Sequence, residues 1–211
     1  MARVYALVFA ALGWFTLVGH YLNRPALHSL GGLLDYLSYF TILSNTLVAA
    51  IFTAAALAPA SRAGRFLLSP PVAMAAAVYI TITALVFHFL LSHLYDLHGW
   101  TATYDHLLHY VLPPAYVLFW LLFVPKGRLR LSSVPWMMLP PLVFAGWTLV
   151  HGAASGFYPY PFVDVTKLGY GGVLVRIAGF VVFFALMGLL YVGLDRLIAR
   201  LGPRAVAPRR A

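Results

Sequence analysis

The chain has 211 residues, of which 63% are hydrophobic and only 9% charged, and its formal net charge is +9. A soluble domain carries about 25% charged residues, so this composition excludes a water-soluble globular protein and favours a single membrane domain. The absence of cysteine excludes disulfides, thiolate catalysis and cysteine-ligated metals. The cations lie in short clusters between apolar runs, so no basic domain is present that could bind nucleic acid.

A transmembrane helix needs about 20 mostly apolar residues to cross roughly 30 Å of hydrocarbon. Six windows meet this requirement, and prolines and glycines separate them: 4–22, 37–57, 72–91, 107–124, 134–150 and 172–190. The sequence therefore predicts an all-α integral membrane bundle of six transmembrane helices. Residues 1–200 form its single domain, and residues 201–211 form a basic cytoplasmic tail.

The distribution of Lys and Arg predicts the orientation of this bundle. With the N-terminus in the cytoplasm, eleven of the 14 cations fall on the cytoplasmic side, and only Arg24, Lys167 and Arg176 fall on the other side. This is the bias of the positive-inside rule. We therefore expect a multi-pass protein of the cell membrane with both termini in the cytoplasm.

In this topology all eight histidines and four of the five acids fall in the outward-facing half of the protein. Titratable groups in a membrane are costly and tend to mark function. Histidines such as His28, His93 and His98 are also expected in hydrated loops. Those in helical windows, His88, His109 and His151, are harder to explain in that way.

The second window begins with a stripe of polar residues. Ser38, Thr41 and Asn45 are spaced three and four apart, which predicts that they share one helical face. Such residues commonly form hydrogen bonds between membrane helices. Alternatively, one hydroxyl is a nucleophile that needs a nearby base, with Asn45 as a possible oxyanion donor. Ser44 and Thr46 compete for the role of nucleophile.

The fourth window supplies a candidate base. Asp105 and His109 are four residues apart, so the carboxylate could orient the imidazole, although Asp105 is equally suited to capping the helix. Pro113 removes the hydrogen-bond partner of the His109 carbonyl and predicts a kink. Thr41 and His109 lie at matching depths in their windows. We therefore predict that Thr41 is the nucleophile and His109 its base.

The segment after the fifth window predicts the rim of a substrate site. His151 is a candidate supporting residue, and the aromatic rings of Tyr160 and Phe162 suit a lipid-like substrate at the membrane interface. Arg176 in the sixth window either extends its side chain to the interface or binds a substrate carboxylate.

These segments resemble the family of the androgen-induced protein and the androgen-dependent TFPI-regulating protein, multipass membrane hydrolases of fatty acid esters of hydroxy fatty acids. The similarity covers most of the chain in helix number and order. Three local motifs carry it: Tyr39-Phe40-Thr41, the run from His109 through Pro113-Pro114, and His151 followed by Tyr160-Pro161-Phe162. The resemblance implies a catalytic Thr and His, and its motifs assign these roles to Thr41 and His109.

The leading prediction is an intramembrane threonine hydrolase that cleaves a lipid-like ester without a metal or other cofactor. Three alternatives stay open: a zinc hydrolase using three or more of His88, His106, His109 and His151; a haem protein with two axial ligands among His88, His109 and His151; and a transporter with helices broken at Pro113-Pro114 and Pro140-Pro141. The sequence predicts no oligomeric state.

Overall fold

The computed structural model describes residues 1–201, and this part of the chain contains helices and no strands. The nine α-helices of these residues are α1 (Ala2–Leu22), α2 (Leu30–Leu37), α3 (Phe40–Leu57), α4 (Arg62–Leu67), α5 (Pro70–Val86), α6 (Gly99–His106), α7 (Leu112–Phe123), α8 (Ser133–Ser155) and α9 (Val165–Leu201). Two segments are π-helical, η2 (Phe87–Leu91) and η4 (Leu107–Val111), and three are short 3₁₀ turns, η1 (Pro25–Leu27), η3 (Ser92–Leu94) and η5 (Pro161–Val163). Apart from Leu201, the predicted basic tail lies outside the described residues.

Six stretches within residues 1–201 are long and apolar enough to cross a membrane: Ala2–Leu22, Phe40–Leu57, Pro70–Leu94, Gly99–Phe123, Ser133–Ser155 and Val165–Leu201. The prediction of an all-α bundle with six membrane-spanning helices is therefore confirmed. The outer faces carry large exposed hydrophobic side chains such as Trp136 and Val175, as expected of surfaces in contact with lipid.

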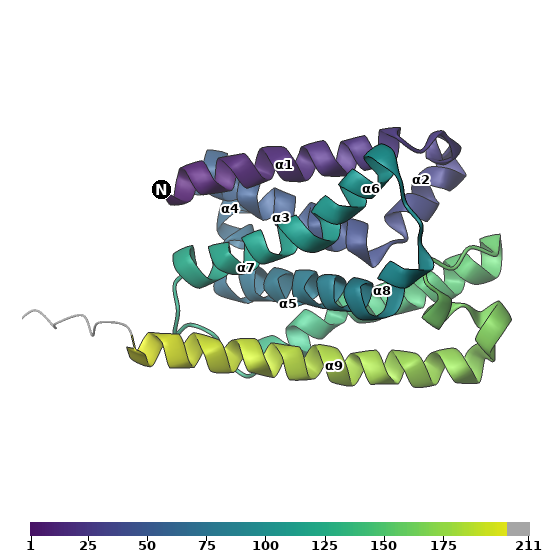
Figure 1. Ribbon diagram of the computed structural model, residues 1–211. Helices are drawn as coiled ribbons and strands as arrows, with labels where there is room; N and C mark the ends of the chain where they lie inside the picture. The colour runs from purple at the N-terminus through teal and green to yellow at the C-terminus, as the bar shows by residue number, and fades with distance from the viewer. Residues whose placement is uncertain (202–211) are drawn as a thin grey trace, which may run out of the picture.

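The bundle is arranged around α5, which packs against α3, α7, α8 and α9, while α1 packs against α3 (Figure 1). Ala73, Ala76 and Ala77 of α5 are completely buried. Small residues of this kind let membrane helices approach closely. These alanines allow the neighbouring helices to pack closely around α5.

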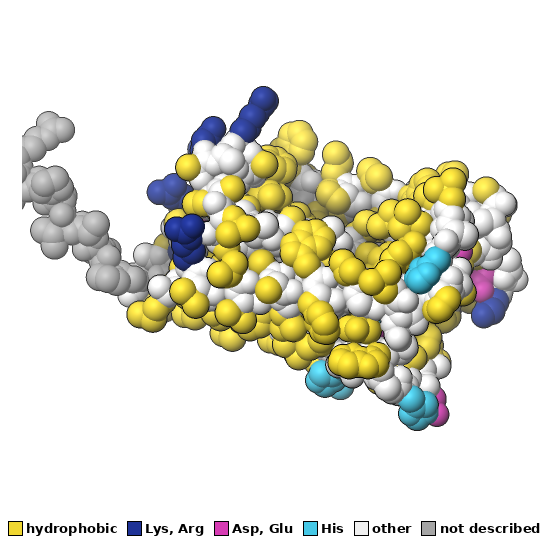
Figure 2. All heavy atoms as spheres, turned by 90° about the horizontal axis from the view of Figure 1, so that it is seen from above, with side chains coloured by type: hydrophobic (Ala, Val, Ile, Leu, Met, Phe, Trp, Pro, Cys, Tyr) yellow, Lys and Arg dark blue, Asp and Glu magenta, His cyan; other side chains and the backbone are white. Residues whose placement is uncertain are grey.

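Both ends of the described chain lie at the same end of the bundle, which we call the terminal end (Figure 1). Figure 2 shows Lys and Arg side chains gathered at the terminal end, and histidines and acids with a further basic side chain at the opposite, distal end, with hydrophobic side chains between the two ends. The two charged ends therefore border an apolar belt. Which end faces the cytoplasm stays a prediction from the positive-inside rule.

Several helix boundaries differ from those predicted, and the sixth span extends furthest beyond its predicted window, from 172–190 to Val165–Leu201. The fourth span begins at Gly99, because residues 99–106 are helical although their polar side chains lower the local hydropathy. The second span begins at Phe40, because the chain breaks at Ser38 and Tyr39 between α2 and α3. By contrast, α8 continues through Pro140 and Pro141, so the break assumed there for a transporter was wrong.

Candidate active site

The hydroxyl of Thr41 lies next to the imidazole of His109 at the distal end of the bundle. Thr41 is the second residue of α3, His109 lies in the middle of η4, and Thr41 Oγ1 is 3.4 Å from His109 Nε2. Both side chains are buried, with exposed fractions of 9% and 5%. The predicted contact between helices two and four is therefore present, and it places an alcohol beside a base.

Two features fix the orientation of the His109 ring. Its Nδ1 is 2.9 Å from the backbone carbonyl oxygen of Asp105, which can only accept, so Nδ1 carries the hydrogen and Nε2 is free to accept from Thr41. The ring also stacks on Phe87, with centroids 3.7 Å apart and planes 11° apart. The imidazole is thus held in the tautomer that a general base requires.

The carboxylate of Asp105 supports this orientation from a longer distance. Its Oδ1 is 3.5 Å from His109 Nδ1, so the shared hydrogen lies closer to the backbone carbonyl than to the carboxylate. Because the helix begins at Gly99, Asp105 lies in its interior and does not cap it. The capping alternative was therefore wrong, and Asp105 acts on the imidazole mainly through its backbone.

The π-helical turn at η4 lies directly before two prolines. The Leu112 amide bonds to the Leu107 carbonyl, so the Leu108 carbonyl loses its α-helical partner, and Pro113 has no N–H to donate to the carbonyl of His109. Asn45 Nδ2 donates to the Leu108 carbonyl at 3.3 Å. The predicted kink is instead a widened turn, and Asn45 satisfies one of the carbonyls that it leaves free.

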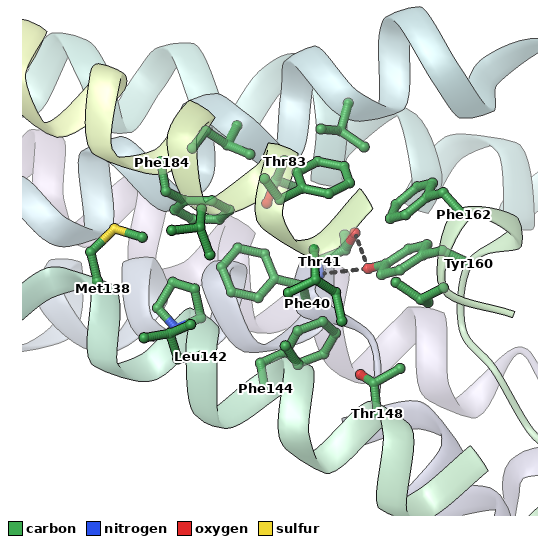
Figure 3. A pocket seen from close by; sticks show the side chains of 18 of the residues that line it. Phe40, Thr41, Thr83, Met138, Leu142, Phe144, Thr148, Tyr160, Phe162 and Phe184 are labelled. Atoms are coloured by element: carbon green, nitrogen blue, oxygen red, sulfur yellow. Dashed lines mark hydrogen bonds between the residues drawn. The ribbon is translucent and has the colours of Figure 1, made fainter. Parts of the chain in front are cut away.

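A third residue, Tyr160, completes the contacts of Thr41. Its hydroxyl oxygen accepts the backbone N–H of Thr41 at 3.2 Å and lies 3.4 Å from Thr41 Oγ1 (Figure 3). The ring stacks on Phe162, with centroids 5.1 Å apart. Burial raises the pKa of Tyr160 to about 12, so the phenol stays protonated at neutral pH and keeps a hydrogen to donate.

Two cavities share Thr41, Leu91 and Tyr160 in their linings. The first, of about 90 Å³, is almost wholly apolar and is lined by α3, α5, α8 and α9, including Phe40, Met138 and Phe144 (Figure 3). The second, of about 80 Å³, is more polar, and its lining includes His109. An elongated molecule that occupied both cavities would pass directly beside the Thr41 hydroxyl.

Close packing between α1 and α6 shapes the polar cavity. A Cβ atom at Gly19 would lie 2.5 Å from the Tyr104 ring, so only glycine lets this ring rest on α1. The contact brings His20 and Arg24 to the same cavity as Asp105 and His109. A cation therefore lies near the hydroxyl and imidazole, and among residues 1–201 it forms no ion pair.

Four predicted site residues lie elsewhere or serve another role: Arg176, Ser38, Asn45 and His151. Arg176 is exposed, donates to the carbonyl of Gly172 in its own helix and lines neither cavity, so its predicted role in substrate binding gains no support from its position. Ser38 lies in the break before α3 and accepts a hydrogen bond from Trp147. It is not on the helical face of Thr41, because α2 ends before it.

Asn45 is not placed to stabilise an oxyanion. Its amide nitrogen donates to the carbonyls of Thr41 and Leu108, at 2.9 and 3.3 Å, which uses both of its hydrogens. Asn45 is completely buried and lines neither cavity. It holds α3 against η4 and so fixes the distance between Thr41 and His109.

His151 pairs with Asp35, and does not contact Thr41 or His109. Its Nε2 is 2.8 Å from Asp35 Oδ1, and its ring stacks on Trp147. This pair joins α8 to α2 beside the site. The supporting role predicted for His151 is therefore one of packing, at a distance from the hydroxyl.

The competing hydroxyls have other partners. Ser44 bonds to Thr83 and to the Thr41 carbonyl, and Thr46 donates to the Ile42 carbonyl. Of the four hydroxyls considered in the second window, only that of Thr41 contacts an imidazole among the described residues. This contact distinguishes Thr41 from its neighbours.

The histidines proposed as metal or haem ligands do not converge. Within residues 1–201, no three His or Asp side chains gather closely enough to hold a metal ion. His88 bonds to Tyr110, His106 stacks on the same ring, and His151 is held by Asp35. Neither cavity is lined by His88 or His151, so the arrangement that the zinc and haem alternatives require is not found in this part of the chain.

Sequence reasoning missed Phe87, His20 and Arg24, and treated Tyr160 only as a rim residue. Phe87 carries no distinguishing signal, because it is one of 15 phenylalanines. His20 lies in the last turn of α1 and Arg24 lies just beyond the end of this helix, and two basic residues so close together could have indicated a polar site.

Comparison with known proteins adds no family to this description. No protein-family model, no curated protein and no solved structure matches the chain.

Proposed function

We propose that the protein is a multi-pass membrane hydrolase that cleaves lipid esters with Thr41 as nucleophile and His109 as general base. The observation that supports this proposal is the contact between Thr41 Oγ1 and His109 Nε2 at the junction of the two cavities. A hydroxyl becomes a competent nucleophile when an oriented base accepts its proton. Contacts of this kind are often loose without substrate and shorten when it binds.

The reaction follows the two steps of covalent catalysis. His109 Nε2 accepts the proton of Thr41 Oγ1 as this oxygen attacks the ester carbonyl, and the tetrahedral intermediate then expels the alcohol, which takes the proton from His109. The acyl group remains on Thr41. A water molecule, deprotonated by His109, attacks this acyl ester. The second tetrahedral intermediate releases the fatty acid as Thr41 Oγ1 leaves and takes the proton back from His109, which restores the hydroxyl.

The cavities support the choice of a lipid-like substrate. The lining of the apolar cavity suits part of an acyl chain, because aromatic and aliphatic side chains make up almost all of it. The polar cavity receives the alcohol part of the substrate and presents Arg24, which is suited to a carboxylate. Fatty acid esters of hydroxy fatty acids, the substrates of the family that the sequence resembles, carry such a group.

The site lies at the end of the bundle opposite the clustered Lys and Arg side chains. By the positive-inside rule, this end faces away from the cytoplasm. We therefore place the reaction at the outer boundary of the cell membrane.

Labelling with a fluorophosphonate and hydrolysis of a fatty acid ester of a hydroxy fatty acid test the proposal. We expect Thr41→Ala to abolish labelling and to lower hydrolysis by about 1,000-fold or more, because the nucleophile is lost. Thr46→Ala is the matched control: it removes a hydroxyl from the same helix that bonds only to the Ile42 carbonyl. Equal labelling of wild type and Thr41→Ala would overturn the proposal.

A further inference from the structure

The proposed reaction requires a hydrogen-bond donor for the negative charge that develops on the ester carbonyl oxygen. Such donors lower the barrier because they are already oriented where the charge appears. Asn45 cannot serve, since both of its amide hydrogens bond to backbone carbonyls. The donor must therefore come from another group beside Thr41.

Tyr160 is the protein hydroxyl closest to the reacting oxygen in both cavities. It lines the apolar and the polar cavity, and its oxygen is 3.4 Å from Thr41 Oγ1. The nucleophilic oxygen and the oxyanion are bonded to the same carbon in the tetrahedral intermediate. A donor that reaches one of them is therefore within reach of the other.

The hydrogen bonds around Tyr160 determine where the hydrogen of its hydroxyl points. Its oxygen accepts the Thr41 backbone N–H, so its own hydrogen points away from that group. Thr41 Oγ1 donates to His109 and can accept the phenol hydrogen in the resting state. When Oγ1 attacks, its electron pair enters the new bond and the carbonyl oxygen becomes the stronger acceptor.

The surroundings keep this donor in place and protonated. The Thr41 N–H belongs to the first turn of α3, where the helix dipole favours negative charge. Stacking on Phe162 and an edge-to-face contact with Tyr39 hold the ring. Burial raises the pKa of Tyr160 to about 12, so the hydroxyl donates without losing its proton at physiological pH.

We propose that Tyr160 is a catalytic residue whose hydroxyl switches its hydrogen bond from Thr41 Oγ1 to the carbonyl oxyanion of the ester. This inference rests on the proposed function and extends it. The phenol forms a bond that is strongest in the transition state, so it accelerates the chemical step more than it favours substrate binding.

Tyr160→Phe tests this role, because it keeps the ring and removes only the hydroxyl. We expect kcat to fall about 100- to 1,000-fold, the effect of losing one oxyanion donor, while KM changes by less than about two-fold. A trifluoromethyl ketone that mimics the tetrahedral intermediate should bind more weakly by a similar factor. The corresponding methyl ketone, which stays trigonal, should bind equally well to both proteins.

Tyr191→Phe is the matched control. Tyr191 is also a buried tyrosine, but its hydroxyl bonds to Thr81 and it lines neither cavity. We expect its kcat to stay within about two-fold of wild type, as expected for a hydroxyl that does not meet the transition state. An equal loss in both variants would show that any buried phenol matters for packing, and would overturn the inference.

Replacement of Tyr160 by 3,5-difluorotyrosine tests the same role if the phenylalanine variant does not fold. Fluorination lowers the phenol pKa and keeps the hydroxyl. Because the phenol then loses its proton at lower pH, the fall in kcat on the alkaline side of the pH profile should also shift to lower pH. An unchanged profile would overturn the inference. Thr41→Ala, measured in parallel, separates the two proposals. If Thr41→Ala keeps the hydrolytic activity, the proposed function is wrong. If Thr41→Ala is inactive while Tyr160→Phe is fully active, only the role of Tyr160 is wrong.

Discussion

The two ends of the bundle each bury a polar group, but these groups differ in how well their hydrogen bonds are satisfied. At the terminal end, Asp195 is 1% exposed and accepts the Leu129 N–H at 3.1 Å. Nearby, Lys126 donates to the carbonyls of Trp120 and Val124 and lies 4.1 Å from the centre of the Trp120 ring. Neither of the two cavities is lined by Asp195 or Lys126.

At the distal end, the contacts of Thr41 with His109 and Tyr160 are longer, and unsatisfied atoms surround them. Three buried side-chain atoms within residues 1–201 lack a hydrogen-bond partner: His20 Nδ1, Asn45 Oδ1 and Thr148 Oγ1. Two of these residues line a cavity, and the third bonds to the Thr41 carbonyl. Buried polar atoms without partners lower stability, and they tend to persist at functional sites. The comparison therefore separates an end that contributes stability from an end that is open to a ligand.

Asp195→Ala gives the largest expected effect on stability and should leave the distal end intact. The change removes the acceptor of the Leu129 N–H and leaves that donor buried, which costs about 2 to 3 kcal/mol. Thermal unfolding in a mild detergent measures the loss as a lower Tm. Asp195→Asn is the control, because its amide oxygen can still accept. The kcat of folded protein should be unchanged in both variants, and a fall in kcat would contradict the division between the two ends.

The sequence predicted the number of spans well, because the length and hydropathy of a membrane helix are local properties. It placed the start of the fourth helix at residue 107, whereas the helix begins at Gly99. His109 therefore lies ten residues into its helix, and the depth argument used to pair it with Thr41 started from the wrong boundary. The two residues meet because α6 extends beyond the apolar stretch and η4 widens at the prolines.

The rest of the site depends on contacts between distant parts of the chain, which no local pattern specifies. Tyr160 is 119 residues from Thr41, and its position depends on how the segment between α8 and α9 returns over α3. The stacking of Phe87 on His109 requires both π-helical turns to face each other. Residue types suggested Thr41 and His109, but the partners that orient them required the three-dimensional arrangement.

Arg24→Gln should have a smaller effect, limited to substrates that carry an acid. Loss of a charge-assisted hydrogen bond costs roughly 1.5 to 3 kcal/mol, so we expect kcat/KM for a fatty acid ester of a hydroxy fatty acid to fall about 10- to 100-fold. The methyl ester of the same substrate should be cleaved equally well by both proteins. Arg176→Gln is the matched control, because Arg176 is exposed and lines neither cavity. An equal fall in kcat/KM in the two arginine variants would show that Arg24 does not bind the carboxylate of the substrate.

Thr148→Val has the smallest expected effect on stability. It tests whether the buried polar atom at this position of the distal end lowers the free energy of unfolding. The Thr148 hydroxyl is buried without a partner on the wall of the apolar cavity, and valine has nearly the same shape without the polar atom. We expect the variant to be more stable by about 1 kcal/mol, because an unsatisfied hydroxyl no longer has to be buried. Thermal unfolding measures the gain, and Thr83→Val is the contrasting control, since its hydroxyl bonds to Ser44 and its removal should destabilise. If Thr148→Val lowered the Tm as much as Thr83→Val, the hydroxyl of Thr148 would be satisfied in the folded protein, and the distal end would not differ from the terminal end at this position.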